Sequence, residues 1–236
     1  YEYIKEQYDY AKVVPDDRTI LLEYNRSDKG PKVVVQALFG RRVTDCLSRA
    51  IAFAIGRTEH RDVEIGINDN GFYIGADRKI NVAGAFRLLK ADKLDIIMAN
   101  AIENSEVFKR RFRHCAARAL MILRNYMGRT KYVGRQQVGS QILMAALKRI
   151  GNDFPILKEA RREVLEDLMD IEHTKRIVQG IEDNTIRIVE IDTEIPTPFA
   201  FQLVMQGFTD ILKMEERQEF LHRMHQMVVA RISLDA

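Results

Sequence analysis

The sequence predicts an α+β fold, in which a small antiparallel sheet with packed helices is followed by a mostly helical lobe. Two hairpin patterns near the start of the chain indicate the sheet. Long stretches in which apolar residues recur every three or four positions indicate the helices. The chain has 236 residues, of which 46% are hydrophobic, and this is enough apolar material to bury a full core.

The first part of the chain contains the end of a helix and a hairpin. Residues 1–12 have a helical pattern and are expected to be the tail of a preceding helix, so the domain proper is expected to span 13–236. Two strands are expected at 18–24 and 32–38, because both stretches are rich in strand-forming residues. The turn formers of 25–31 separate them, which predicts the first hairpin.

The segment after this hairpin is expected to be a helix that packs on it. Apolar residues recur at helical spacing over 41–55, and Gly56 is the expected stop. We expect the sheet-containing lobe to span 13–80. A mainly helical lobe with one late strand is expected to follow over 81–236.

A second hairpin is the strongest local prediction. Strands at 62–67 and 72–74 flank a turn that contains Asn70-Gly71. The Asn-Gly pair readily adopts the positive φ values that a tight hairpin turn requires. We therefore expect these two strands to pair antiparallel.

The second lobe reads as helical from residue 81 onward. Breaks between its helices are expected near 90–92, near 104–105 and through 127–134. One helix is expected to begin at Asp153, an N-cap residue with Pro155 just inside. Residues 185–191 alternate apolar and charged side chains and predict the late strand. A last helix is expected from about 210 to about 231.

Composition excludes several function classes. The two cysteines, Cys46 and Cys115, lie in apolar helical patterns, so we expect them to be reduced, and two cysteines are too few for a cysteine-based zinc site. The sequence lacks the Gly-x-x-x-x-Gly-Lys-Ser/Thr phosphate loop. We predict no catalytic site, metal site or cofactor in this chain, a cytoplasmic location and no membrane segment. The missing initiator Met suggests a piece of a longer chain.

The charges of the chain are segregated along the sequence. Residues 107–152 contain eleven Lys and Arg and no Asp or Glu, whereas residues 153–236 contain ten basic and seventeen acidic side chains. Like charges on neighbouring helix turns repel each other, and phosphate groups would relieve this repulsion. The basic segment therefore predicts a nucleic-acid partner.

Two interpretations of the basic segment remain open. Either its side chains bind the phosphate backbone, or the acidic final third of the chain pairs with them in ion pairs within the fold. Tyr126 and Tyr132 lie in the same segment and are candidates for stacking on bases. The expected backbone contacts are Arg110, Arg111, Arg113, Arg118, Arg124, Arg129, Lys131 and Arg135, with Arg41 and Arg42 as second candidates.

Five sequence blocks resemble those of a known family. They are LFGRRV at 38–43, DVEIGINDNGF at 62–72, RFRHCAARAL at 111–120, GRQQ at 134–137 and PTPFA at 196–200. In this order they resemble the carboxy-terminal DEAD/H-associated domain of archaeal Lhr-type (large helicase-related) helicases. The resemblance covers nearly the whole chain.

The resemblance implies a superfamily 2 ATP-dependent 3′-to-5′ helicase. Two RecA-like motor domains, where ATP and Mg²⁺ bind, and a winged-helix domain would lie upstream and contact this domain within one chain. The domain would help to hold the translocating single strand of a single-stranded or partly duplex DNA or RNA. Bacterial relatives commonly stack a tryptophan on the strand; this sequence has none, so Phe39, Tyr126 or Tyr132 would take that role. The alternative is a structural brace that docks on the motor and winged-helix domains without nucleic-acid contact.

Overall fold

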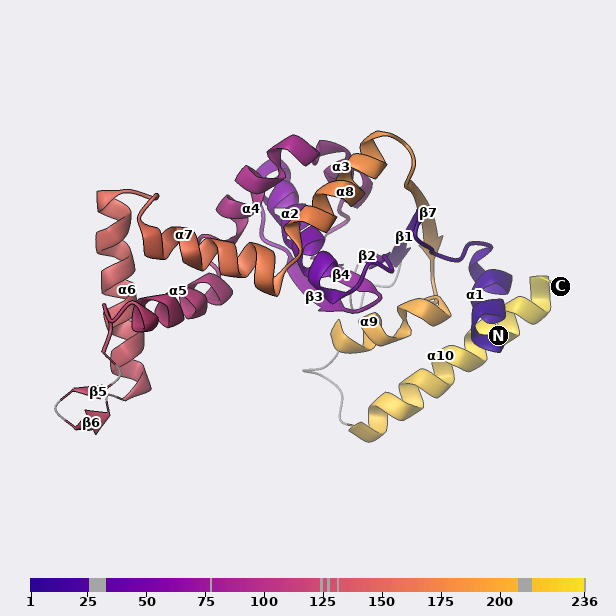
Figure 1. Ribbon diagram of the computed structural model, residues 1–236. Coiled ribbons are helices and arrows are strands. Elements are labelled where there is room, and N and C mark those ends of the chain that lie inside the picture. Colours follow the sequence, from indigo (N-terminus) through magenta and orange to yellow (C-terminus); the bar gives the residue numbers. More distant parts are fainter. Residues whose placement is uncertain are drawn as a thin grey trace. The chain divides into compact units, whose positions relative to one another are not determined.

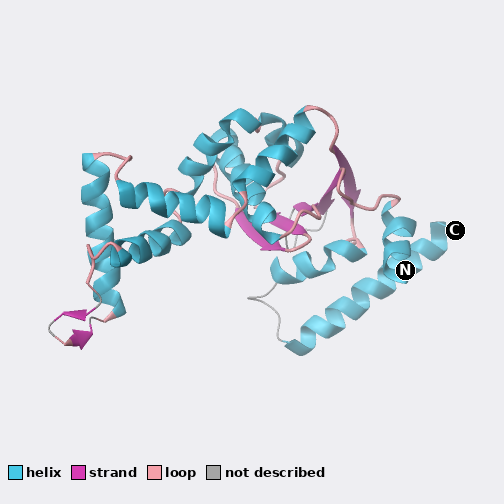
Figure 2. Cartoon of the chain, in the orientation of Figure 1, coloured by secondary structure: helices cyan, strands magenta, loops and turns pink. Residues whose placement is uncertain are grey.

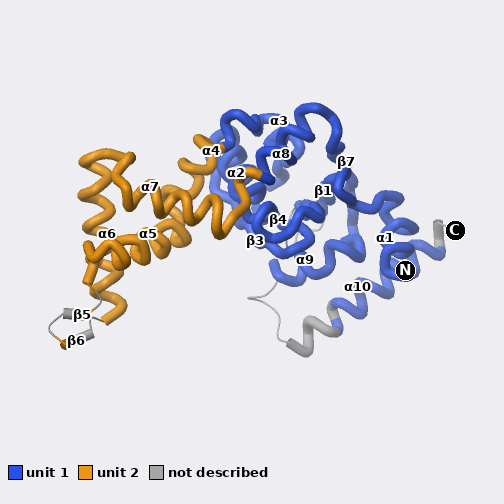
Figure 3. Tube along the Cα trace, in the orientation of Figure 1, with its two compact units in different colours: residues 1–94, 173–236 blue, residues 95–172 orange. Residues whose placement is uncertain are grey.

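The structure, a computed structural model shown in Figure 1, describes residues 1–25, 33–76, 78–123, 125–126, 128–130, 132–207 and 214–235. The chain forms two compact units, coloured separately in Figure 3. Unit 1 comprises Tyr1–Leu94 and His173–Ala236, and unit 2 comprises Asp95–Glu172. Strands are concentrated in unit 1, and helices dominate unit 2 (Figure 2).

Unit 1 is built around a five-stranded mixed sheet with the strand order β3-β4-β2-β1-β7. The strands are β1 (Thr19–Asn25), β2 (Val33–Gln36), β3 (Glu64–Asn68), β4 (Gly71–Gly75) and β7 (Arg187–Thr193). The helices are α1 (Glu2–Ala11), α2 (Arg41–Glu59), α3 (Val82–Leu88), η1 (Ala91–Lys93), α8 (Ile171–Glu182), η3 (Pro198–Ala200), α9 (Phe201–Gly207) and α10 (Met214–Asp235). Of these, α8 begins at the end of unit 2.

Both faces of the sheet are covered by helices. Val34 of β2 pairs with Tyr73 of β4, and these two side chains form an apolar cluster with Leu203 of α9. Side chains alternate between the two faces of a strand, and α2 packs on β3 and β4. The central strands are buried for this reason, and the core of unit 1 lies on both sides of β2.

Gly71 allows the close approach of two strands. A Cβ atom at this position would lie 2.0 Å from the carbonyl oxygen of Val35, so a larger residue would force β4 away from β2. The predicted Asn-Gly hairpin is confirmed. Its turn is held by the Asn68 side chain, whose Oδ1 accepts from the Asn70 N–H at 2.9 Å, rather than by a positive φ at Asn70.

Helix α1 is anchored to the segment that leads into α9. The Tyr3 hydroxyl donates to the Pro198 carbonyl at 2.8 Å, and the Tyr10 hydroxyl donates to the Ile195 carbonyl at 2.9 Å. The Gln7 side chain is buried and accepts from the Phe199 N–H at 3.1 Å. The predicted helix at 1–12 is therefore observed, and these contacts place it within unit 1.

A buried glutamate joins three strands of the sheet to the same segment. Glu23 of β1 is 1% exposed. Its Oε1 accepts from Thr193 Oγ1 (2.9 Å) and Thr197 N (2.8 Å), and its Oε2 accepts from Thr197 Oγ1 (2.6 Å) and Gln36 Nε2 (2.9 Å). Burial raises the pKa of the Glu23 carboxyl, and these hydrogen bonds offset part of the shift. The carboxyl therefore ties β1, β2 and β7 together.

Unit 2 is helical apart from one short hairpin. Its elements are α4 (Leu94–Ile102), which begins at the last residue of unit 1, α5 (Glu106–Arg118), β5 (Asn125–Tyr126), β6 (Arg129–Thr130), α6 (Val133–Ile150), α7 (Pro155–Arg162) and the π-helix η2 (Glu163–Leu168). Helix α5 packs against α6, α7 and η2. Phe108, Phe112 and Leu157 are fully buried in this core.

The α+β class is confirmed, and so is the late strand. The sheet is mixed rather than antiparallel, because β7 joins β1 in parallel, with Ile20 opposite Ile188. The same pairing brings the last part of the chain back to the sheet, so the compact units differ from the expected lobes 13–80 and 81–236.

Two predicted helix ends were wrong. Helix α2 continues through Gly56 to Glu59, and His60 adopts the left-handed conformation instead. Helix α7 has Phe154, not Asp153, as its N-cap, because Pro155 occupies the first helical position.

Candidate nucleic-acid interface

Helix α5 carries the first half of the basic segment. It begins after Ser105, whose hydroxyl accepts from the Phe108 N–H at 3.2 Å and caps the helix. Phe108, Phe112 and Cys115 recur at helical spacing and are buried. This apolar face fixes the helix, so its basic side chains lie on the remaining faces.

One face of α5 is occupied by an ion pair within the fold. Arg111 Nη1 donates to Glu163 Oε2 at 3.3 Å, and Arg118 donates to Glu163 Oε1. Arg111 and Arg118 are seven residues apart and share a face of the helix. Glu163 is 4% exposed, and the burial of a carboxylate is costly unless it is paired or hydrogen-bonded. The prediction that part of the basic segment pairs with the acidic final third is confirmed for these two arginines.

A second carboxylate holds basic side chains of two other helices. Glu103 Oε1 lies 2.8 Å from Lys148 Nζ of α6, and its Oε2 lies 3.5 Å from Arg161 Nη2 of α7. Lys109 pairs with Glu106 within α5, at 2.7 Å. These side chains therefore contribute to the packing of unit 2 or to local pairs on its surface.

Among the side chains of the basic segment that the structure describes, four arginines remain, and we call them the arginine set. They are Arg110, Arg113, Arg135 and Arg149. Among the residues that the structure describes, none of the four is in an ion pair. Arg113 is half-buried and the other three are exposed. Two lie on α5 and two on α6, so unit 2 presents cationic groups with free hydrogen-bond donors to solvent.

The start of α6 adds an exposed aromatic ring. Tyr132 precedes the helix and is 82% exposed. The first turn has neither a side-chain cap nor an acidic residue. The ring therefore stands on the surface three residues before Arg135 in the chain, without a carboxylate in that turn.

The remaining predicted contacts are placed elsewhere or are not described. Arg129 lies on β6 and Tyr126 on β5, and Arg124 and Lys131 are outside the described residues. Arg41 and Arg42 open α2 in unit 1 and are exposed. Phe39 is partly buried and less open to a ligand than Tyr132.

Sequence reasoning missed three residues that shape this surface. Glu163 and Glu103 select which cations are paired, and neither sequence spacing nor periodicity shows that they face α5, α6 and α7. Arg149 was counted in the basic segment but was not named as a contact. Helical periodicity could have indicated Arg149 as an exposed residue, because it lies on the side of α6 opposite the buried Met144 and Leu147.

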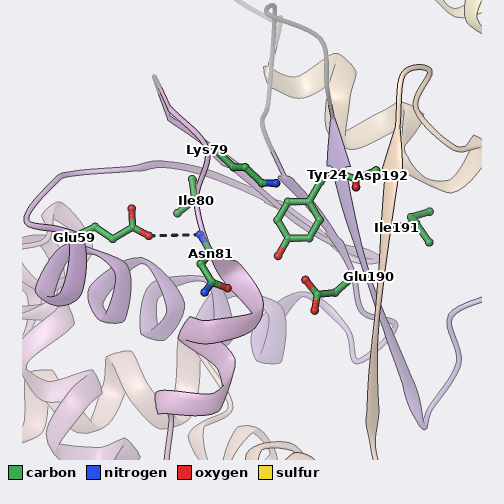
Figure 4. Close-up of a pocket in the computed structure, with 8 residues that line it drawn as sticks. All are labelled: Tyr24, Glu59, Lys79, Ile80, Asn81, Glu190, Ile191 and Asp192. Atoms are coloured by element: carbon green, nitrogen blue, oxygen red, sulfur yellow. Dashed lines mark hydrogen bonds between the residues drawn. The ribbon is translucent and has the colours of Figure 1, made fainter.

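Unit 1 contains an open pocket of about 570 Å³, shown in Figure 4. It is lined by Tyr24, Glu59, Lys79, Ile80, Asn81, Glu190, Ile191 and Asp192. The Tyr24 hydroxyl points toward the Glu190 carboxylate. Burial, together with this carboxylate, raises the pKa of Tyr24 to about 12. With three carboxylates on its wall the pocket would repel phosphates, so we exclude it from the candidate interface.

The described residues contain no candidate metal site and no activated thiol. No group of three or more His, Cys, Asp or Glu among them could hold a metal ion. No helix within these residues is long and apolar enough to cross a membrane. Burial, with the nearby Glu163 carboxylate, raises the pKa of the Cys115 thiol to about 11, which makes it a poor nucleophile at neutral pH.

Comparison with known proteins gives relatives over nearly the full chain. An ATP-dependent helicase Lhr-Core of Methanothermobacter thermautotrophicus is 49% identical over 98% of the chain, and one of Saccharolobus solfataricus is 39% identical over 97%. The Lhr helicase/uracil glycosylase of Escherichia coli is 30% identical over 85%. The chain spans 27% of the length of the first two relatives and 13% of the third.

A solved structure has the same fold. It is the Mycobacterium smegmatis helicase Lhr bound to ssDNA and AMP-PNP, with a TM-score of 0.73 and 29% identity. The match covers 86% of this chain and 26% of that one. Residues 14–200 match the DEAD/H associated family. Together with the archaeal Lhr-Core relatives, this match confirms the predicted resemblance: the chain belongs to the DEAD/H associated family, as it occurs in Lhr-type helicases.

Proposed function

We propose that this chain holds a single nucleic-acid strand on the basic surface of unit 2, as an accessory part of an ATP-dependent 3′-to-5′ DNA or RNA helicase. One observation carries the proposal. The segment 107–152 contains no carboxylate. Glu163 and Glu103, which lie outside this segment, pair with other basic side chains, and the arginine set has no ion pair among the described residues.

Arginine is suited to this task. Its planar guanidinium can donate two parallel hydrogen bonds to a phosphate. Each phosphate that is neutralised releases counterions, so the affinity depends strongly on salt. Phosphate contacts do not distinguish base sequence, and DNA and RNA strands are both candidate ligands. Tyr132 is proposed to stack on a base.

The names of the relatives support the proposed setting. Several are ATP-dependent helicases, and the matched solved structure contains ssDNA and AMP-PNP. We infer that RecA-like motor domains of the whole protein bind ATP and Mg²⁺, and that this chain contacts them and a winged-helix domain. We place the protein in the cytoplasm. Single-stranded and partly duplex nucleic acids are the proposed substrates.

The test is fluorescence anisotropy of a labelled single strand of about 12 nucleotides, within the usual range of strand-binding sites, titrated at low salt. The test variant changes Arg110, Arg113, Arg135 and Arg149 to Ala. The control variant changes Lys5, Arg87, Lys93 and Arg176 to Ala. These four control residues are exposed in unit 1. Both variants lose the same charge.

The two variants have opposite expected results. Removal of the arginine set should weaken binding at least about 100-fold, because each charged contact contributes roughly 1 kcal/mol or more. The control should bind within about threefold of the wild type, because its charges belong to unit 1 and not to the proposed surface of unit 2. Equal losses in both variants would mean that only net charge matters and would contradict the proposed site. Circular dichroism of each variant verifies the fold.

A second candidate function is favoured by one face of α6. Val138 and Ile142 are 57% and 66% exposed, and Ala145 and Ala146 on the same side are also exposed. A continuous apolar stripe of this kind is typical of a protein-docking surface. It supports a brace that contacts other domains. Absence of strand binding by the folded chain at low salt would favour the brace over the strand-holding function.

A further inference from the structure

The C-terminal end of α5 has an unusual residue in a left-handed conformation. Leu120 has φ 57°. The Leu120 N–H donates to the Ala117 carbonyl at 3.2 Å, and the Met121 N–H donates to the Ala116 carbonyl at 3.0 Å. These two bonds define a Schellman motif, in which the left-handed position is normally glycine. The backbone at Leu120 is therefore fixed by the helix end.

This position is unfavourable for leucine in two ways. A side chain in the left-handed region clashes with the backbone, and Leu120 is 73% exposed, so burial does not compensate. The other non-glycine residues with positive φ in the described chain are Lys12, His60 and Asn184. All three are polar and suited to water. Among the described residues, Leu120 is thus the one apolar residue that combines a left-handed backbone with an exposed side chain.

Leu120 is part of a small apolar patch. Met121 and Leu123 follow it and are 44% and 39% exposed. The segment that contains all three has no Asp or Glu over 46 residues, and Arg113 lies on α5 about 10 Å along the helix axis before Leu120. The patch therefore lies in a segment that combines apolar side chains with cations and contains no acidic residue of its own.

One class of ligand has the complementary chemistry. A single nucleic-acid strand is a polyanion whose unpaired bases present apolar faces. Leucine and methionine side chains are known wedges against bases in protein–nucleic acid complexes. An apolar protein segment would match the patch but would gain nothing from the cations of the same segment.

We propose that Leu120, with Met121 and Leu123, forms the apolar contact with the bases, while the arginine set binds the phosphates. The inference rests on the proposed function and adds to it a residue that recognises bases rather than charge. It also accounts for the left-handed leucine. The bound strand would cover a side chain that is costly for the free protein.

The diagnostic variant is Leu120→Gly, because glycine suits the backbone and removes the contact. Its melting temperature should equal or exceed that of the wild type. Leu120→Asn serves as a second variant, since asparagine also tolerates this conformation. Asn184→Gly, at a polar left-handed site in unit 1, is the matched control.

Each protein is titrated with two labelled strands of equal length and charge, one with bases and one with abasic sugars throughout. Leu120→Gly and Leu120→Asn should weaken binding to the strand with bases roughly fivefold, as expected if about half of the leucine is covered. Binding of both variants to the abasic strand should stay within about twofold, since phosphate contacts remain. Asn184→Gly should match the wild type on both strands.

The possible failures are distinguishable. If the wild type binds neither strand, both the proposed function and this inference are overturned. If it binds but the two Leu120 variants bind the strand with bases as tightly as the wild type, only the Leu120 proposal fails, and the patch would be left to a protein partner. Equal losses on both strands would also overturn it, because the leucine would then act through the phosphate-binding side chains.

Discussion

Among the described residues, each compact unit buries one glutamate, and the two units stabilise it in different ways. Glu23 in unit 1 accepts four hydrogen bonds from neutral donors, the side chains of Gln36, Thr193 and Thr197 and the Thr197 N–H. Glu163 in unit 2 is held by Arg111 and Arg118. Glu23 in unit 1 is thus stabilised without a cation, whereas Glu163 in unit 2 pairs with two.

This difference explains why the arginine set matters. If every arginine of the basic segment were needed for packing, the segment would resemble an ordinary ion-paired helix. Glu163 instead engages the two arginines on one face of α5 and leaves Arg110 and Arg113 on another. The arginines outside ion pairs, rather than the total number of cations, are what a phosphate backbone can bind.

The largest expected effect on stability comes from removing the buried carboxyl of Glu23 in unit 1. Glu23→Ala removes the acceptor of four hydrogen bonds and leaves a cavity, so the free energy of unfolding should fall by about 4 kcal/mol. Chemical denaturation measures it. Glu190→Ala, on the exposed edge strand β7, is the control and should change stability by less than about 1 kcal/mol. A loss that small at Glu23 would contradict its role in joining β1, β2 and β7.

The corresponding change in unit 2 should cost less. Glu163→Gln leaves two guanidinium groups beside a neutral amide, but Arg118 is more than half exposed and can be rehydrated. We expect the free energy of unfolding to fall by about 2 kcal/mol. Glu159→Gln removes an exposed carboxylate that pairs with Arg162 at 2.8 Å, and it should cost less than about 0.5 kcal/mol. If both substitutions lowered the free energy of unfolding equally, the buried Glu163 would stabilise the fold no more than the exposed Glu159 does.

A smaller effect concerns pH. Burial raises the pKa of Glu23 above its ordinary value of 4.5, so the folded protein retains a proton that the unfolded chain releases. Its contribution to stability is therefore present below pH 4.5 and is lost as the pH rises through the folded pKa. The stability of the wild type relative to Glu23→Gln should decline above pH 4.5 by at most about 1.4 kcal/mol per pH unit. Urea denaturation over a pH series tests this. A free energy of unfolding of the wild type that rises with pH relative to that of Glu23→Gln would contradict it.

The smallest expected effects separate the two faces of α5. Arg110→Gln should leave the midpoint of urea denaturation unchanged but weaken strand binding about fivefold, since it removes one charged contact. Arg111→Gln should do the reverse and lower the free energy of unfolding by about 1 kcal/mol, with little change in binding. Identical behaviour of the two variants would mean that the faces are not functionally distinct.

Local features of the fold could be predicted because their causes are local. Both hairpins, the late strand and the helix after β2 follow from turn residues and apolar periodicity. The pairing of β7 with β1 could not be predicted, because the alternation around Ile188 indicates a strand but not its neighbour. The start of α7 was displaced by one residue because Pro155 determines the first helical position.

The site was predictable as a charge pattern but not as a surface. The absence of carboxylates over 107–152 can be read from the sequence alone. Which cations are paired depends on Glu163, which is 52 residues from Arg111 along the chain and meets it only when α7 and η2 pack on α5. The exposed Leu120 was missed for a related reason, since it follows a helical apolar pattern and its left-handed backbone has no signal in the sequence.

The salt dependence of strand binding is the most direct test of the account. The dissociation constant of the wild type and of the variant without the arginine set is measured between about 50 and 200 mM salt. The slope of log affinity against log salt should be steep for the wild type and lower by roughly 0.7 for each arginine removed, or about 3 in total. The control variant from unit 1 should keep the wild-type slope. A slope that is the same for all three proteins would contradict the claim that these arginines contact the phosphates.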